Sequence, residues 1–150
     1  MALSEDVFNR LDQLIREEEI PGYLQNIDKF QRESRRYPES TPDGLMKKID
    51  WLTQQLALTG RVSAYLDLDA KRAYNERVRV FNEAKQNASR GDKEATAQLA
   101  ITDLREAEAR AESRAELWKK EFKSLQENIY RLRLKARQDL DIHRSGAEGA

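Results

Sequence analysis

The sequence predicts an all-α protein built around a long antiparallel helical hairpin. Apolar and small residues recur at alternating steps of three and four from residue 45 to residue 136, the spacing of a helix that packs against a partner helix. Charged residues make up 36% of the chain and aromatic residues 7%, which is typical of long exposed helices rather than of a thick core. The repeat fades near Gly91, so the two arms are expected to fold back on each other.

Residues 1–37 are predicted to form two short helices ahead of the hairpin. Ser4 precedes two acidic residues, as is common where a helix begins. This first helix is expected to end near Glu19, because the segment Ile20-Pro21-Gly22 interrupts the helical spacing. A second helix is expected from Tyr23. Residues 38–44 contain two prolines and a glycine and are predicted to be a linker.

The hairpin is predicted over residues 45–144, with its turn near 88–93 and a disordered tail at 145–150. Gly91 suits the left-handed position that closes a helix, and Asp92 suits the cap of the next one. The first heptad seam comprises Leu45, Ile49, Leu52, Leu56, Thr59, Ser63, Leu66, Ala70, Ala73, Arg77, Val80 and Ala84. The second comprises Ala97, Ile101, Leu104, Glu108, Ala111, Ala115, Trp118, Phe122, Leu125, Ile129, Leu132 and Ala136.

Bulky residues are concentrated in the part of the seams farthest from the turn, where Trp118 and Phe122 are the largest side chains. Both are expected to be buried in the core. Further apolar residues, such as Trp51, Val62 and Leu134, lie off the seams. A two-helix hairpin cannot bury them all, so they require either the N-terminal helices or a second copy of the chain. We therefore expect a homo-oligomer.

Catalytic and metal-binding patterns are missing from the sequence. It has no cysteine and a single histidine, His143, so neither a thiolate zinc site nor a Ser-His-Asp arrangement can be argued. There is no Gly-rich phosphate loop, and the acidic residues near Glu108 lack the Glu-x-x-His partners of di-iron helices. The sequence therefore predicts no enzyme activity, no cofactor and no metal site.

No apolar run approaches the length of a membrane span, so no membrane partner is expected. The acidic N-terminus lacks the basic start and apolar stretch of a signal peptide. A cytoplasmic location is therefore expected.

Charge is balanced overall, with 27 basic and 27 acidic residues, but it is unevenly distributed. Residues 119–144 carry 8 basic and 4 acidic residues, and residues 91–118 carry 4 and 7. Antiparallel pairing would bring the basic segment near the start of the first arm. Ordinary solvent-facing charges are one interpretation; a phosphate-binding surface is the other. On the second interpretation, the candidate nucleic-acid-binding residues are Lys47, Lys48, Lys119, Lys120, Lys123, Arg131, Arg133, Lys135 and Arg137.

Three aromatic residues lie near these cations in the sequence: Tyr37, Trp51 and Tyr130. Each is of a type that stacks on nucleic-acid bases. Packing in the protein core explains them equally well.

The layout resembles phage recombination mediator proteins of the UvsY type. The resemblance covers Lys48 to Leu140, including Trp51-Leu52, Tyr65, Ala70-Lys71-Arg72-Ala73-Tyr74 and the segment Glu116 to Arg137. It implies a small helical protein that assembles into rings, binds single-stranded DNA and helps to load a recombinase.

Two other classes of function fit the same sequence. A protein–protein adaptor, assembly chaperone or inhibitor would use the off-seam apolar residues as anchors in a groove. A structural coiled-coil component of a larger particle would use them for assembly. Salt-dependent binding to single strands would favour the DNA-binding class. Co-purification with one protein at high salt would favour the adaptor.

Overall fold

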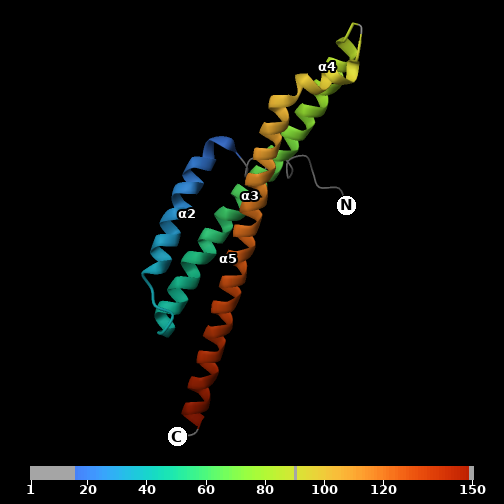
Figure 1. Ribbon diagram of the computed structural model, residues 1–150. Coiled ribbons are helices and arrows are strands. Elements are labelled where there is room, and N and C mark those ends of the chain that lie inside the picture. Colours follow the sequence, from blue (N-terminus) through green and yellow to red (C-terminus); the bar gives the residue numbers. More distant parts are fainter. Residues whose placement is uncertain (1–15, 90, 149–150) are drawn as a thin grey trace, which may run out of the picture. The chain divides into compact units, whose positions relative to one another are not determined.

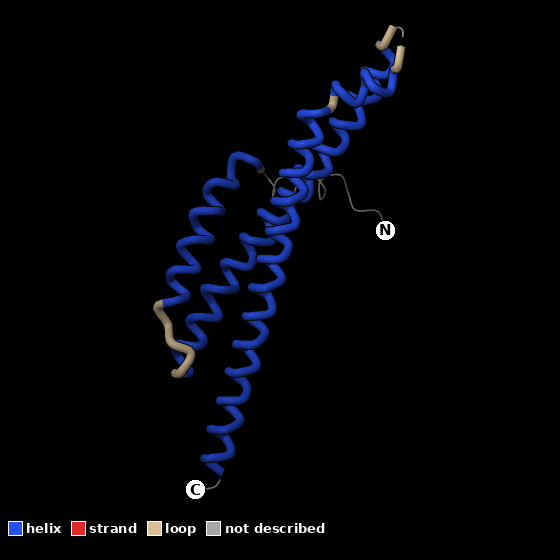
Figure 2. The backbone as a smooth tube through the Cα atoms, in the orientation of Figure 1, coloured by secondary structure: helices blue, strands red, loops and turns tan. Residues whose placement is uncertain are grey.

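The structure is a computed structural model that describes residues 16–89 and 91–148. Every regular element in these residues is helical, and none is a β-strand (Figures 1 and 2). In chain order the elements are η1 (Glu17–Glu19), α2 (Ile20–Arg35), α3 (Pro42–Asn87), α4 (Lys93–Ala100) and α5 (Thr102–Glu148). The predicted all-α fold class is confirmed. The helix expected to start at Ser4 lies largely outside the described residues.

The chain divides into two compact units, and α3 and α5 contribute to both. Unit 1 combines the chain up to Val62 with the chain from Lys120 onward, and unit 2 comprises Ser63–Lys119. Within each unit, a segment of α3 runs antiparallel to a segment of α5. In unit 1, α2 also lies beside the beginning of α3 (Figure 1).

Helix α2 starts earlier than the sequence indicated. The expected break at residues 20–22 is wrong, because α2 begins at Ile20 and places Pro21 in its first turn. Proline is tolerated there, since the first amide groups of a helix have no intrahelical acceptor to lose. The helix packs on α3 through Phe30, whose ring centroid lies 5.6 Å from that of Trp51.

Helix α3 also begins inside the predicted linker. The hydroxyl of Thr41 accepts a hydrogen bond from the amide of Gly44, at 3.2 Å, and Pro42 occupies the first helical position. This Thr-Pro start is a favourable helix cap. The irregular segment between α2 and α3 is therefore residues 36–41 rather than the predicted 38–44. A side chain at Gly44 would place its Cβ atom 2.6 Å from the carbonyl oxygen of Pro38, which explains the glycine.

Between α3 and α4 the chain turns in the segment where the sequence placed the turn. Gly91 adopts a φ of 99°, the left-handed region that glycine enters without strain. The carboxylate of Asp92 then accepts a hydrogen bond from the amide of Ala95, at 3.1 Å, and caps α4.

The second arm differs from the single helix that was expected. It is interrupted at Ile101, whose backbone leaves the helical region at φ −107° and ψ 9°. The hydroxyl of Thr102 donates to the carbonyl oxygens of Gln98 and Leu99, a local bonding pattern that bends helices.

At its other end, α5 continues to Glu148, so residues 145–148 do not belong to a disordered tail. No proline is present to stop the helix, and a single glycine costs only about 1 kcal/mol. Residues 149 and 150 lie outside the described residues.

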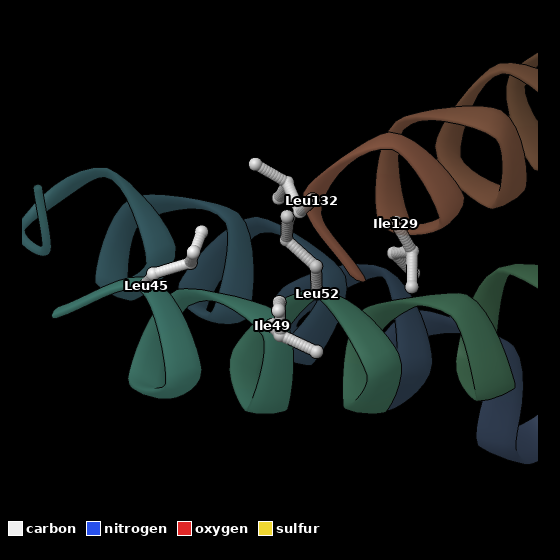
Figure 3. Packing of buried hydrophobic residues seen from close by; sticks show 5 residues of the cluster. All are labelled: Leu45, Ile49, Leu52, Ile129 and Leu132. Atoms are coloured by element: carbon white, nitrogen blue, oxygen red, sulfur yellow. The ribbon is translucent and has the colours of Figure 1, made fainter. Parts of the chain in front are cut away.

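The core of unit 1 is formed by aliphatic side chains from both arms. Ile129 and Leu132 of α5 point toward Leu45, Ile49 and Leu52 of α3 (Figure 3). All five belong to the predicted seams, and Leu132 is completely buried. The core of unit 2 is smaller, since its buried cluster consists of Ala70, Ala111 and Ala115.

The largest seam residues are less buried than predicted. Trp118 and Phe122 are both half-buried. In unit 1, the ring of Phe122 lies over Gly60, where a Cβ atom would come within 3.1 Å of the ring. The glycine therefore allows the ring to approach the backbone of α3 closely. Truncating either aromatic residue is therefore expected to cost less than the roughly 3–5 kcal/mol typical of fully buried rings.

The antiparallel pairing in unit 2 predicts a short distance between Arg79 and Arg105. The ion pair between Arg77 and Glu108 and the ion pair between Lys85 and Glu94, at 3.3 Å, fix the register on either side. Nitroxide labels at Arg79 and Arg105 should give a pulsed-EPR distance well below about 30 Å, because packed helices lie about 8–10 Å apart. Dilution with unlabelled chain leaves only label pairs within one molecule. A longer distance between the two labels in that sample would mean that the arms pair between molecules.

Candidate nucleic-acid interface

Helix α5 carries most of the predicted cations, and its geometry separates them into two groups. Successive residues of an α-helix are rotated by about 100°, so residues four apart share a face and residues two apart do not. Arg131 and Lys135 therefore lie on one flank of α5, and Arg133 and Arg137 lie on the opposite flank. The candidate set does not form one continuous patch.

The first flank faces the loop between α2 and α3, where it meets Glu39. The guanidinium of Arg131 donates to both carboxylate oxygens of Glu39, at 3.2 and 3.3 Å. Nζ of Lys135 lies 3.9 Å from the same carboxylate. The hydrogen bond from Arg131 lowers the pKa of Glu39 despite its desolvation, and the charges of Arg131, Lys48 and Lys135 add to the effect. Glu39 is thus the common partner of two predicted cations, Arg131 and Lys135.

Sequence reasoning missed Glu39. The partners of Arg131 are Glu39 and the side-chain oxygen of Asn128. Glu39 and Arg131 are 92 residues apart. No local spacing connects them.

Other predicted cations are also compensated nearby. Lys47 lies 3.1 Å from Asp43, and the hydrogen bond to Asp43 raises the pKa of Lys47. Its ammonium group also lies over the ring of Tyr37. In unit 2, Lys119 lies 3.7 Å from Asp67. Lys120 belongs to unit 1 and is exposed.

The second flank of α5 has a different character. Lys123, Tyr130, Arg133 and Arg137 follow one another at steps of seven, three and four, so they share one face. We call these four residues the outer face. All four are exposed, and Tyr130 is 66% exposed. Among the described residues, none of the three cations forms an ion pair.

The aromatic candidates separate in the same way. Trp51 packs against Phe30, and Tyr37 lies beneath Lys47. Tyr130 presents its ring to solvent, so it is the aromatic candidate that remains accessible for stacking.

Within the part of the chain that the structure describes, no group of three or more His, Cys, Asp or Glu side chains is placed to hold a metal ion. The side chain of His143 is outside that part. None of the helices described is long and apolar enough to cross a membrane. No protein-family model, curated protein sequence or solved structure matches the chain.

Proposed function

We propose that the chain is a non-enzymatic, oligomeric helical protein that binds single-stranded DNA through the outer face of α5. In this proposal it serves as an accessory factor in DNA recombination, with a recombinase as its protein partner. The resemblance to phage recombination mediators supports the process and the partner. The exposed cations and tyrosine of the outer face support single-stranded DNA as the ligand.

The observation that carries the proposal is the exposed ring of Tyr130 among cations that have no ion-pair partner in the described residues. Proteins that bind single strands without sequence preference combine a positively charged track with aromatic rings on which bases stack. Arg133 lies three residues from Tyr130, and Lys123 and Arg137 lie seven residues to either side. Phosphates on both sides of a stacked base would thus meet a cation.

Three cations are few, which supports the oligomeric part of the proposal. Each phosphate neutralised on a single strand contributes about −0.7 to the slope of log affinity against log salt. One copy would thus give a slope of only about −2 and bind weakly. Several copies on one strand would combine their contacts through effective concentration.

The experiment compares two double variants of α5 with the same spacing. Arg133→Gln/Arg137→Gln removes two cations from the outer face, whereas Arg110→Gln/Arg114→Gln removes two exposed arginines from unit 2. Oligothymidine binding is followed by fluorescence anisotropy over a range of salt concentrations. Per copy, the first variant should flatten the salt slope by about 1.4, because two phosphate contacts are lost. The second should leave the slope unchanged.

Equal losses in the two variants would show that general charge, rather than the outer face, governs binding. The wild-type chain must itself bind at about 50 mM salt, where screening is weak. If it does not, the DNA-binding proposal is wrong.

An adaptor function is the second candidate, because unit 1 has a small apolar pocket. It is lined by Pro42, Leu45, Met46, Ala136, Asp139 and Leu140 and has a volume of about 110 Å³. Of these lining residues, Met46 and Leu140 are exposed. Such a pocket can hold one apolar anchor of a partner helix. Retention of a defined protein at high salt, lost in Met46→Glu, would favour this function.

A further inference from the structure

We infer that Arg131 and Lys135 form a phosphate-binding site, and that Glu39 occupies this site as a tethered substitute for the phosphate. A DNA phosphate and the Glu39 carboxylate would then compete for the same cations. The inference rests on the proposed single-strand binding for the identity of its ligand. It uses a different flank of α5 from the outer face.

The first support is the geometry around the carboxylate. Arg131 reaches both oxygens of Glu39, at 3.2 and 3.3 Å, which is the two-pronged arrangement that guanidinium groups adopt with either a carboxylate or a phosphate. Lys135 approaches from the same helix, at 3.9 Å. The charge of Lys48 of α3 also lowers the pKa of Glu39. Two cations one helical turn apart on α5 therefore contact one anion.

The second support is the imbalance of charge. Two cations of α5 face the carboxylate of Glu39, so these three side chains together keep a net positive charge. Fixing a loop to a helix needs only one ion pair, which leaves the two cations only partly compensated. A phosphodiester group would use them, because its charge and its oxygens can be shared among several donors.

The third support is that Glu39 can leave without disturbing the core. It lies in the irregular segment 36–41 between α2 and α3, and 34% of its side chain is exposed. Ion pairs exposed to this extent stabilise a fold only slightly. Beside it is an open groove of about 240 Å³, lined by Glu39, Ser40, Pro42, Lys135, Asp139 and Ile142. An incoming phosphate has room there, although Asp139 in the same lining opposes an anion.

The competition predicts that removing the charge of Glu39 strengthens binding. Glu39→Gln should raise the affinity for oligothymidine by about 5- to 10-fold at 50 mM salt and steepen the salt slope by about 0.7, since one more phosphate can be neutralised. The matched control is Glu76→Gln. Glu76 is also paired with an arginine, at 2.6 Å, but it lies in unit 2. The control makes the same change in net charge away from the site.

A second pair of variants tests which cations are responsible. In the wild-type background, Arg131→Gln/Lys135→Gln should lower the affinity by a smaller factor than in the Glu39→Gln background, because Glu39 already compensates part of their charge. In the Glu39→Gln background, the same two changes should abolish the gain. Equal effects of Glu39→Gln and Glu76→Gln would overturn the inference. So would a loss of affinity in Glu39→Gln with unchanged thermal unfolding.

Inorganic pyrophosphate separates this inference from the proposed function. Titrated into Glu39→Gln at constant ionic strength, it should raise the melting temperature more than it does in Glu76→Gln. If that difference is present but no variant binds the oligonucleotide, the phosphate site stands and the DNA-binding proposal fails. If the wild-type chain binds DNA but the difference is absent, the outer face stands and the Glu39 site is rejected.

Discussion

Leu132→Ala should lower the free energy of unfolding by about 2–5 kcal/mol, the range for deleting a fully buried leucine side chain. The side chain of Leu132 has no exposed surface. It packs in the cluster formed by Leu45, Ile49, Leu52 and Ile129 (Figure 3). These neighbours come from two long helices whose backbones cannot close easily around a gap. The lost transfer free energy of the deleted atoms and the free-energy cost of the remaining cavity should therefore add up.

The matched control is Leu134→Ala, which removes the same atoms two residues along the same helix. Leu134 is 39% exposed, so its loss should cost less than about 1 kcal/mol. Urea unfolding followed by circular dichroism measures both variants. Similar costs for the two leucines would mean that the face of α5 carrying Leu132 is not the core of unit 1.

The heptad pattern was sufficient to predict the face that the second arm, residues 93–148, buries. The buried side chains described there are Ala97, Ile101, Glu108, Ala111, Ala115, Ile129 and Leu132, and each belongs to the predicted second seam. The period of seven determines the face that a helix turns toward one partner. This relation between period and buried face is the same whether the buried residue is bulky, small or charged.

The same pattern failed where a helix has two partners. Gln55 and Val62 of α3 are buried but lie off the predicted seam. They follow Trp51 by four and eleven residues, so they share its face, and Trp51 contacts Phe30 of α2. A two-helix repeat has no position for this third helix, so the sequence could only indicate that such residues needed some cover.

The candidate interface was predictable in part. The separation of Arg131 from Arg133 follows from helical rotation alone, and grouping them by their place in a basic run overlooked it. The role of Glu39 was not accessible in this way. It depends on where the loop between α2 and α3 meets α5, which is set by the packing of three helices and not by any local spacing.

Glu108→Ala should destabilise unit 2 by about 3 kcal/mol, the lower end of the range for removing one partner of a buried ion pair. Glu108 accepts a hydrogen bond from Arg77 across the two arms, and their side chains are only 11% and 23% exposed. The variant would leave the guanidinium of Arg77 without its carboxylate in a largely dry position. The surrounding core of Ala70, Ala111 and Ala115 buries little apolar area that could offset this cost.

A second variant distinguishes the cost of an orphaned charge from the value of the pair. Replacing both partners, as in Arg77→Leu/Glu108→Leu, removes the desolvation penalty together with the attraction, and it should restore or exceed the wild-type stability. The control is Glu106→Ala, which breaks an exposed pair with Arg110 and should cost less than about 0.5 kcal/mol. Amide hydrogen exchange in unit 2 reports each effect locally. If the double leucine variant were as unstable as Glu108→Ala, the ion pair itself would hold the two arms together, because apolar packing could not replace it.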